Sequence, residues 1–271
     1  MIPRDFITEW RSVAPWASDE QVEQDIVLSR AAIDIFSTSQ LASSLAWRGG
    51  TALHKLYLNP AARYSEDIDL VQTVAAPIGG TFDAVRKVLD PWLGEPRRVL
   101  KEGRVNLVYC FHSEGPPPMP LRLKVEINSR EHFACLGHCH RQLEVSSRWW
   151  SGSATVTTYQ LDELLGTKLR ALYQRKKGRD LFDLWHAIEG KSVSPERVVT
   201  CFERYMLEGS SRVTRAVYEE NLLRKLLDKA FRADIAPLLR PGMRWDIDRA
   251  AATILEVLIS RLPGEPSRGH D

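Results

Sequence analysis

The fold of this chain is decided by residues 47–71, which have the sequence WRGGTALHKLYLNPAARYSEDIDLV. The segment opens with a glycine pair, Gly49 and Gly50. Thr51 follows as the expected N-cap of a helix whose apolar side chains recur at helical spacing. A helix that begins directly after flexible glycines offers backbone N–H groups and the positive end of its dipole to an anion. The first half of the segment therefore predicts a cradle for phosphate groups.

The second half of the segment ends in an acidic sequence, SEDIDLV, at residues 65–71. If this sequence forms a strand, Asp67 and Asp69 share one face, while Ile68 and Leu70 point into the core. Two neighbouring carboxylates repel each other, and they are best accommodated around a divalent cation. Hard oxygen ligands favour Mg²⁺ or Mn²⁺. We therefore expect a metal site at Asp67 and Asp69.

A phosphate cradle followed by a D-x-D strand resembles the polymerase-beta-like nucleotidyltransferases. This version is most similar to the AbiEii-type toxins of bacterial toxin–antitoxin systems, which include the MenT toxins. The matching segments are residues 48–53, RGGTAL, and residues 63–70, RYSEDIDL. Each motif alone has an ordinary interpretation, a turn for the glycine pair and a solvated strand end for the aspartates. The two motifs together, in this order and spacing, favour the nucleotidyltransferase interpretation.

The clearest strand pattern is that of residues 121–128, LRLKVEIN, in which apolar and polar side chains alternate. By itself this pattern fits an antiparallel strand with one solvated face. The resemblance implies instead that Glu126 is the third metal-binding carboxylate, on a strand next to the D-x-D strand. Residues 126–133, EINSREHF, also match the AbiEii-type sequence that follows this strand.

A further matching block covers residues 158–188 and predicts two helices, the first of them capped by Thr158. The resemblance implies that Lys168 and Asp180 are functional residues. Lys168 would add positive charge where the leaving group forms, at the mouth of the site and with little burial. Asp180 would be either a partner of Lys168 or a participant in deprotonation.

The turn between these two helices is strongly basic, and we expect it to border the catalytic cleft and contact RNA phosphates. Its cationic residues are Arg175, Lys176, Lys177 and Arg179. The ordinary alternative is a solvated basic turn without a ligand. Because the net charge of the chain is only +2, nucleic-acid binding has to come from such a local patch.

Composition is that of an ordinary globular protein, with 44% hydrophobic and 27% charged residues among 271. The four cysteines are too few and too scattered for a disulfide scaffold. No stretch approaches the roughly 18 apolar residues of a membrane span, and no signal-peptide pattern is present. We expect a soluble, cytoplasmic protein that does not bind membranes.

The predicted fold class is α+β. We expect a polymerase-beta-like nucleotidyltransferase core, a small mixed sheet flanked by helices, over residues 1–158. Residues 159–271 would form a C-terminal helical bundle that completes the active site.

The resemblance implies a nucleotidyltransferase toxin that transfers a nucleoside monophosphate from an NTP to RNA, with the tRNA 3′ end as the favoured acceptor, and so blocks translation. An AbiEi-like antitoxin would be its partner. Two Mg²⁺ ions, or Mn²⁺, would be held by Asp67, Asp69 and Glu126. The triphosphate would be held by Gly49, Gly50, Thr51 and Lys168.

Two alternative functions remain open. One is nucleotidyl transfer to a small molecule, as in antibiotic-modifying relatives with the same cradle and carboxylates. The other is a nucleotide-binding regulator that no longer turns over, which the complete carboxylate set disfavours. The basic turn favours RNA over a small acceptor.

Overall fold

The computed structural model describes residues 2–101 and 103–267, which form two compact units. The N-terminal unit contains the residues up to 159 together with 238–242, and the C-terminal unit contains 160–237 and the residues from 243 onward. The short segment 238–242 joins the N-terminal unit through backbone hydrogen bonds. Tyr64 N–H donates to the Leu238 carbonyl at 2.8 Å, and Arg240 N–H donates to the Ala62 carbonyl at 2.9 Å.

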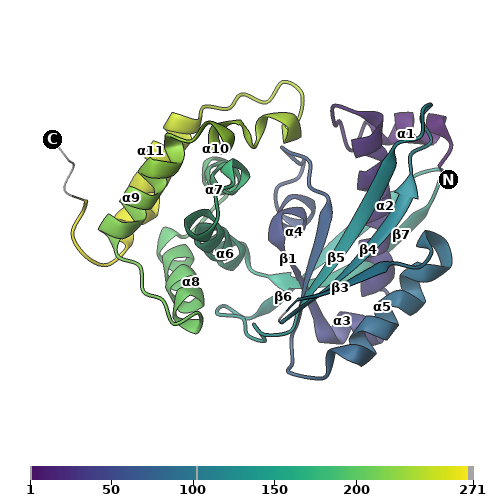
Figure 1. Cartoon of the computed structure of the whole chain (residues 1–271), viewed down its shortest axis with the longest axis horizontal. Coiled ribbons are helices and arrows are strands. Elements are labelled where there is room, and N and C mark those ends of the chain that lie inside the picture. Colours follow the sequence, from purple (N-terminus) through teal and green to yellow (C-terminus); the bar gives the residue numbers. More distant parts are fainter. Residues whose placement is uncertain (1, 102, 268–271) are drawn as a thin grey trace. The chain divides into compact units, whose positions relative to one another are not determined.

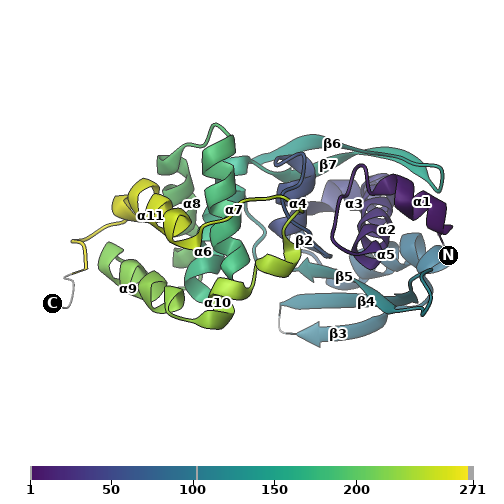
Figure 2. The same cartoon turned by 90° about the horizontal axis from the view of Figure 1, so that it is seen from above.

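The N-terminal unit is built on a seven-stranded mixed sheet in the order β3-β4-β5-β2-β1-β7-β6, with β3 and β6 at its edges (Figure 2). The strands are β1 (Leu45–Arg48), β2 (Asp67–Gln72), β3 (Arg97–Lys101), β4 (Arg104–His112), β5 (Pro120–Asn128), β6 (His138–Ser146) and β7 (Ser151–Tyr159). The pairs β1–β7 and β2–β5 are parallel, and the other pairs are antiparallel. The predicted mixed sheet is confirmed.

Helices cover the sheet of the N-terminal unit (Figure 1). They are α1 (Arg4–Trp10), α2 (Asp19–Phe36), α3 (Ser39–Ser44), α4 (Gly49–Leu56) and α5 (Ile78–Leu93). The long helix α2 begins directly after Ser18, which forms a reciprocal capping box with Gln21. Its buried face packs on β5, β6 and β7, where alternate apolar side chains such as Val125 and Ile127 form the core. The polar side chains of β2 and β5 lie on the other face of the sheet, where they are available to form a site.

The C-terminal unit is helical, as predicted. It contains α6 (Leu161–Gln174), α7 (Gly178–Gly190), α8 (Pro195–Glu208), α9 (Arg215–Leu226), α10 (Lys229–Ala233) and α11 (Ile247–Val257). Helices α9 and α10 are separate, because the Asp228 carboxylate accepts a hydrogen bond from Phe231 N–H and caps a new helix. No helix among the described residues is long and apolar enough to cross a membrane.

One predicted cap is wrong. Thr158 does not begin α6, whose N-cap is Gln160. Thr158 is instead the penultimate residue of β7, where its hydroxyl donates to the Trp47 carbonyl at 2.6 Å. This bond ties β7 to β1, the strand that leads directly into the glycine pair.

Candidate active site

The glycine pair forms the start of α4 itself. The sequence predicted Thr51 as the N-cap, but the helix begins two residues earlier, and Arg48 occupies the cap position without a capping side-chain bond. Gly49 has a φ of +84°, a conformation that residues with a side chain rarely adopt. The first N–H groups of α4 therefore lack a side-chain cap, as suits a helix end that receives an anion.

Gly49 lies directly against the D-x-D strand. A Cβ atom at this position would come within 2.1 Å of the Asp69 Oδ2 atom, so that no other residue fits without displacing the carboxylate. The strand register explains the contact, because Arg48 of β1 is paired with Asp69 of β2. The N-terminus of α4 and the Asp69 carboxylate are thus immediate neighbours.

Gly50 lies against a second side chain, that of Arg63. A Cβ atom at Gly50 would be 2.5 Å from Arg63 Nη2, and the arginine is only 3% exposed. Thr51 is also buried, and its hydroxyl is 2.8 Å from the Ser65 hydroxyl. Arg63 lies in the matching segment but was not predicted as a site residue, because the sequence does not show that the loop returns to the start of α4.

The three predicted carboxylates lie on one face of the sheet. Strand β2 pairs in parallel with β5, and Asp69 is directly opposite Glu126 in that pairing. Asp67 lies two residues before Asp69 and therefore faces the same side, while Ile68 and Leu70 are buried on the other side as predicted. The predicted adjacency of the two strands is confirmed.

The charges of this carboxylate group are not fully balanced. Burial raises the pKa of Asp69, and the neighbouring charges of Asp67 and Glu126 raise it further. The positive charges of Lys124 and Arg48 act in the opposite direction without cancelling the effect. The ionised form of Asp69 therefore needs more positive charge nearby than Lys124 and Arg48 supply, and a bound cation would provide it.

Two cationic side chains contact these carboxylates, Lys124 from β5 and Arg104 from β4. The Lys124 ammonium is 3.1 Å from Asp67 Oδ2 and 3.6 Å from Glu126 Oε2, and Arg104 Nη1 is 3.2 Å from Glu126 Oε1. Burial lowers the pKa of Lys124, but the charges of its carboxylate neighbours, Asp67 foremost, raise it above its ordinary value. Lys124 was not predicted as a site residue, although its spacing of two from Glu126 puts it on the same strand face.

The donor chemistry of Asp67, Asp69 and Glu126 fits a hard divalent cation such as Mg²⁺ or Mn²⁺. Within residues 2–101 and 103–267, however, no three His, Cys, Asp or Glu side chains are arranged closely enough to hold a metal ion. What the structure has between Asp67 and Glu126 is the Lys124 ammonium, within 4 Å of both carboxylates.

A second charged cluster lies in the C-terminal unit around Lys168. Its ammonium is 3.1 Å from Asp180 Oδ1 and 2.8 Å from Asp183 Oδ2, and both aspartates are completely buried. Arg175 also donates two hydrogen bonds to Asp180, at 2.6 and 2.8 Å. Lys168 is itself only 6% exposed, so the expectation of a lysine with little burial is wrong. Its second partner, Asp183, was not among the predicted site residues.

The electrostatics of Asp180 are the reverse of those of Asp69. Burial acts to raise the pKa of Asp180, but the positive charges of Lys168 and Arg175 outweigh burial and lower it. Asp180 is therefore a stable carboxylate with little tendency to accept a proton.

The basic turn carries its own counter-charges. The Lys176 ammonium is 2.6 Å from an Asp228 oxygen, and the Lys177 ammonium is 3.4 Å from an Asp234 oxygen. Arg179 also approaches Asp234, at 4.0 Å. With Arg175 paired to Asp180, each of the four predicted RNA-binding residues has a carboxylate partner. The turn is thus less cationic than its sequence indicates.

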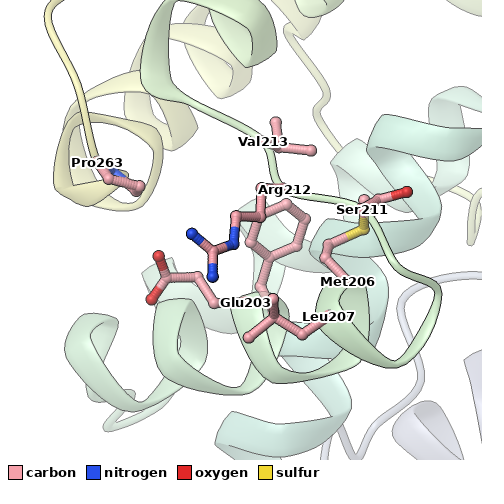
Figure 3. A pocket seen from close by; sticks show the side chains of 8 residues that line it. Glu203, Met206, Leu207, Ser211, Arg212, Val213 and Pro263 are labelled. Carbon is pink, nitrogen blue, oxygen red and sulfur yellow. The ribbon is translucent and has the colours of Figure 1, made fainter.

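A cavity of about 240 Å³ lies elsewhere in the C-terminal unit, between α8 and the segments that follow it (Figure 3). The apolar side chains of Met206, Leu207 and Val213 line it, together with the charged side chains of Glu203 and Arg212. None of the residues predicted from the sequence to be functional lines this cavity.

A mixed sheet with a glycine-started helix beside strand carboxylates is an arrangement that suits nucleotidyl transfer. The family of the nucleotidyl transferase AbiEii toxin of type IV toxin–antitoxin systems matches residues 31–253. The chain belongs to this family of nucleotidyltransferase toxins. The predicted resemblance is therefore confirmed.

Solved structures show the same fold. MenT4, a nucleotidyltransferase toxin from Mycobacterium tuberculosis H37Rv, is similar with a TM-score of 0.58 and 15% sequence identity, over 97% of this chain and 91% of that chain. A protein of H. pylori described as a nucleotidyltransferase has a TM-score of 0.54 and 17% identity, over 88% of this chain and 92% of its own. No curated protein sequence matches the chain. The predicted fold class is confirmed by these likenesses.

Proposed function

We propose that this toxin transfers a nucleoside monophosphate from an NTP to the 3′ end of tRNA and so blocks translation. The observation that carries the proposal is the contact of Gly49 with Asp69, which makes the uncapped start of α4 a neighbour of the carboxylate face. Triphosphate oxygens and the cation that neutralises them need adjoining sites. A helix N-terminus and a set of carboxylates in contact meet that need.

Each group around the start of α4 has a role in this proposal. The N–H groups of Gly50 and Thr51 donate to phosphate oxygens, while the Thr51 hydroxyl, paired with Ser65, fixes the loop that leads into the aspartate strand β2. Arg63, packed on Gly50, adds positive charge next to the phosphates. These groups stabilise the negative charge that develops on the departing pyrophosphate.

Asp67, Asp69 and Glu126 would hold the divalent cation, proposed as two Mg²⁺ ions with Mn²⁺ as a substitute. When bound, the cation neutralises triphosphate charge and favours the deprotonated form of the acceptor hydroxyl. In the reaction, the 3′ hydroxyl oxygen of the acceptor forms a bond to the α-phosphorus. The bond from that phosphorus to the β-phosphate oxygen breaks, pyrophosphate leaves, and the hydroxyl proton is released.

Lys168 and Asp180 keep the functional role that the family resemblance implies, with one refinement. Of the two roles that the sequence left open for Asp180, we propose that of partner to Lys168. The 3.1 Å contact between them supports this role, and the lowered pKa of Asp180 makes it a weak base. Asp183 would share in holding the lysine from the other side.

We propose an RNA acceptor because of the chemistry of the basic turn, and an antitoxin partner because of the family to which the chain belongs. Lys176 and Lys177 are about half exposed, and ion pairs of such residues are weak enough to exchange for phosphate contacts. The basic turn is therefore retained as the proposed RNA contact, although its partners reduce its charge. An AbiEi-like antitoxin would counteract the toxin.

The test is a transfer assay with each of the four α-labelled NTPs, Mg²⁺ and total tRNA, with Asp69→Asn as the inactive control. We expect label on tRNA with wild type, and none after periodate oxidation has destroyed the 3′ diol of the acceptor. Label that appears only on a small acceptor, such as an aminoglycoside, would support the antibiotic-modifying alternative. If the protein transfers label to neither acceptor, the result would support the other alternative, a nucleotide-binding regulator that does not turn over.

A further inference from the structure

Lys124 holds an unexpected position for a lysine, at the centre of the carboxylate face. In the pairing of β2 with β5 it lies directly opposite Asp67, and Glu126 follows two residues later on the same strand face. Its ammonium contacts both side chains, at 3.1 and 3.6 Å. The ammonium and a bound metal ion would therefore use the same carboxylate oxygens.

The contacts of Lys124 can be exchanged at small cost. Lys124 and Asp67 are 30% and 39% exposed at their side chains, so water can replace either partner. An ion pair with this exposure contributes little to stability, in contrast to a fully buried pair. The lysine stem is also long and flexible, and it can move the ammonium away while its backbone stays in the sheet.

The local charges indicate when the exchange happens. Lys124 and Arg104 together offset two of the three carboxylate charges, which weakens the attraction of the face for a free divalent ion. A triphosphate bound at the start of α4 adds several negative charges next to the same face. A metal ion that arrives with the nucleotide is therefore attracted far more strongly than one that arrives alone.

We propose that Lys124 is a tethered cation that competes with the divalent metal for Asp67 and Glu126, so that tight metal binding requires the nucleotide. This inference rests on the proposed function, because it takes the carboxylate face as the metal site. It makes Lys124 a positioning residue that holds the carboxylates in place in the metal-free protein. It also links assembly of the site to the presence of substrate.

The experiment is a calorimetric titration of Mn²⁺ into the full-length protein, with and without a non-hydrolysable α,β-methylene NTP. Lys124→Met removes the competing charge, and we expect it to bind Mn²⁺ about tenfold more tightly than wild type without nucleotide. The gain in affinity that the nucleotide causes should shrink by a similar factor. Lys124→Gln provides a second neutral variant, and Lys124→Arg should restore the wild-type behaviour.

Arg122→Met is the matched control, because Arg122 is an exposed cation on the same strand and the same face. It should leave Mn²⁺ affinity unchanged, and the same tightening in this variant would overturn the inference in favour of a general charge effect. Unchanged or weaker Mn²⁺ affinity in both neutral Lys124 variants would also overturn it, while leaving the metal site intact. Wild type and all variants binding no Mn²⁺ under any condition would overturn the inference together with the proposed metal site.

Discussion

Asp69 on β2 and Asp180 on α7 are both aspartates among other charged groups, but their pKa values shift in opposite directions. Asp69 shares one strand face with two more carboxylates, Asp67 and Glu126, and the neighbouring Lys124 is partly exposed. Asp180 is completely buried, with Lys168 and Arg175 bonded to it. The first cluster is short of positive charge and is suited to bind a cation. In the second cluster the negative charges are already balanced by Lys168 and Arg175, so it is suited to hold Lys168 in place.

The largest expected effect is that of Lys168→Ala in the balanced cluster. Removing this lysine leaves Asp180 and Asp183 buried without their shared partner, and we expect the free energy of unfolding to fall by about 3–5 kcal/mol. Urea denaturation followed by circular dichroism measures this change. Lys191→Ala, at an exposed position after α7, is the control and should stay within about 0.5 kcal/mol of wild type. A Lys168→Ala protein as stable as this control would show that the cluster is not a structural unit.

Gly49→Ala tests the contact between the helix start and the carboxylate face. The new Cβ atom meets both an unfavourable φ of +84° and the Asp69 carboxylate, so we expect a loss of about 1–3 kcal/mol in stability together with loss of transfer. Gly79→Ala in α5 is the matched glycine variant, since nothing lies within 4 Å of its Cβ position. It should be neutral or stabilising by up to about 1 kcal/mol. If Gly49→Ala and Gly79→Ala had the same effect on stability and on transfer, the contact of Gly49 with Asp69 would not be important for the site.

Asp69→Asn and Asp180→Asn test the opposite signs of the two pKa shifts. Because the folded-state pKa of Asp69 is raised, the protein loses stability as the pH rises from the ordinary pKa of an aspartate to that raised value. Asp69→Asn should therefore make the metal-free protein more stable at neutral pH. Because the pKa of Asp180 is lowered, its ionised form adds stability that is lost as the pH falls through the folded-state value. Asp180→Asn should therefore be destabilising at neutral pH. Thermal melts of wild type and both variants between pH 3 and pH 8 measure these effects, and changes in stability of the same sign in both variants at neutral pH would contradict the comparison.

The smallest effect on stability is expected in the basic turn. Lys176→Gln with Lys177→Gln breaks two half-exposed ion pairs, which changes the free energy of unfolding by about 1 kcal/mol at most. If these lysines bind RNA phosphates, the log–log salt dependence of tRNA binding should flatten by roughly 0.7–0.9 for each phosphate that the double variant no longer binds. Arg175 is left unchanged here, because its bonds to Asp180 would mix a folding defect into the result. An unchanged slope would count against the turn as the RNA contact.

Much of the fold followed from local patterns in the sequence. Alternation over residues 121–128 predicted β5 with its buried face. The strand β6 has no clear pattern in the sequence, because its apolar residues are few and most of its side chains are exposed at the sheet edge. The caps at Thr51 and Thr158 were wrong because both threonine hydroxyls bond to distant partners, Ser65 and the Trp47 carbonyl.

The sequence predicted the carboxylates of the candidate site, but it did not predict the positive charges that lie beside them. The D-x-D spacing and the family resemblance identified Asp67, Asp69 and Glu126, and the structure brings their strands together. The positions of Lys124 and Arg63 depend on strand register and on the return of a loop, neither of which the sequence specifies. The burial of Lys168 was also unpredictable, since a basic helix end has the same sequence whether its lysine is solvated or enclosed.

The central claim is that the face formed by Asp67, Asp69 and Glu126 is a cation site that works together with a bound triphosphate. It is tested most directly by counting Mn²⁺ ions bound per chain in the presence of a non-hydrolysable NTP, by equilibrium dialysis with electron paramagnetic resonance detection. We predict two ions for wild type and at most one for a folded Asp69→Asn protein, with transfer to tRNA lost in the variant. The same number of bound ions in the two proteins, with transfer retained in Asp69→Asn, would contradict the account.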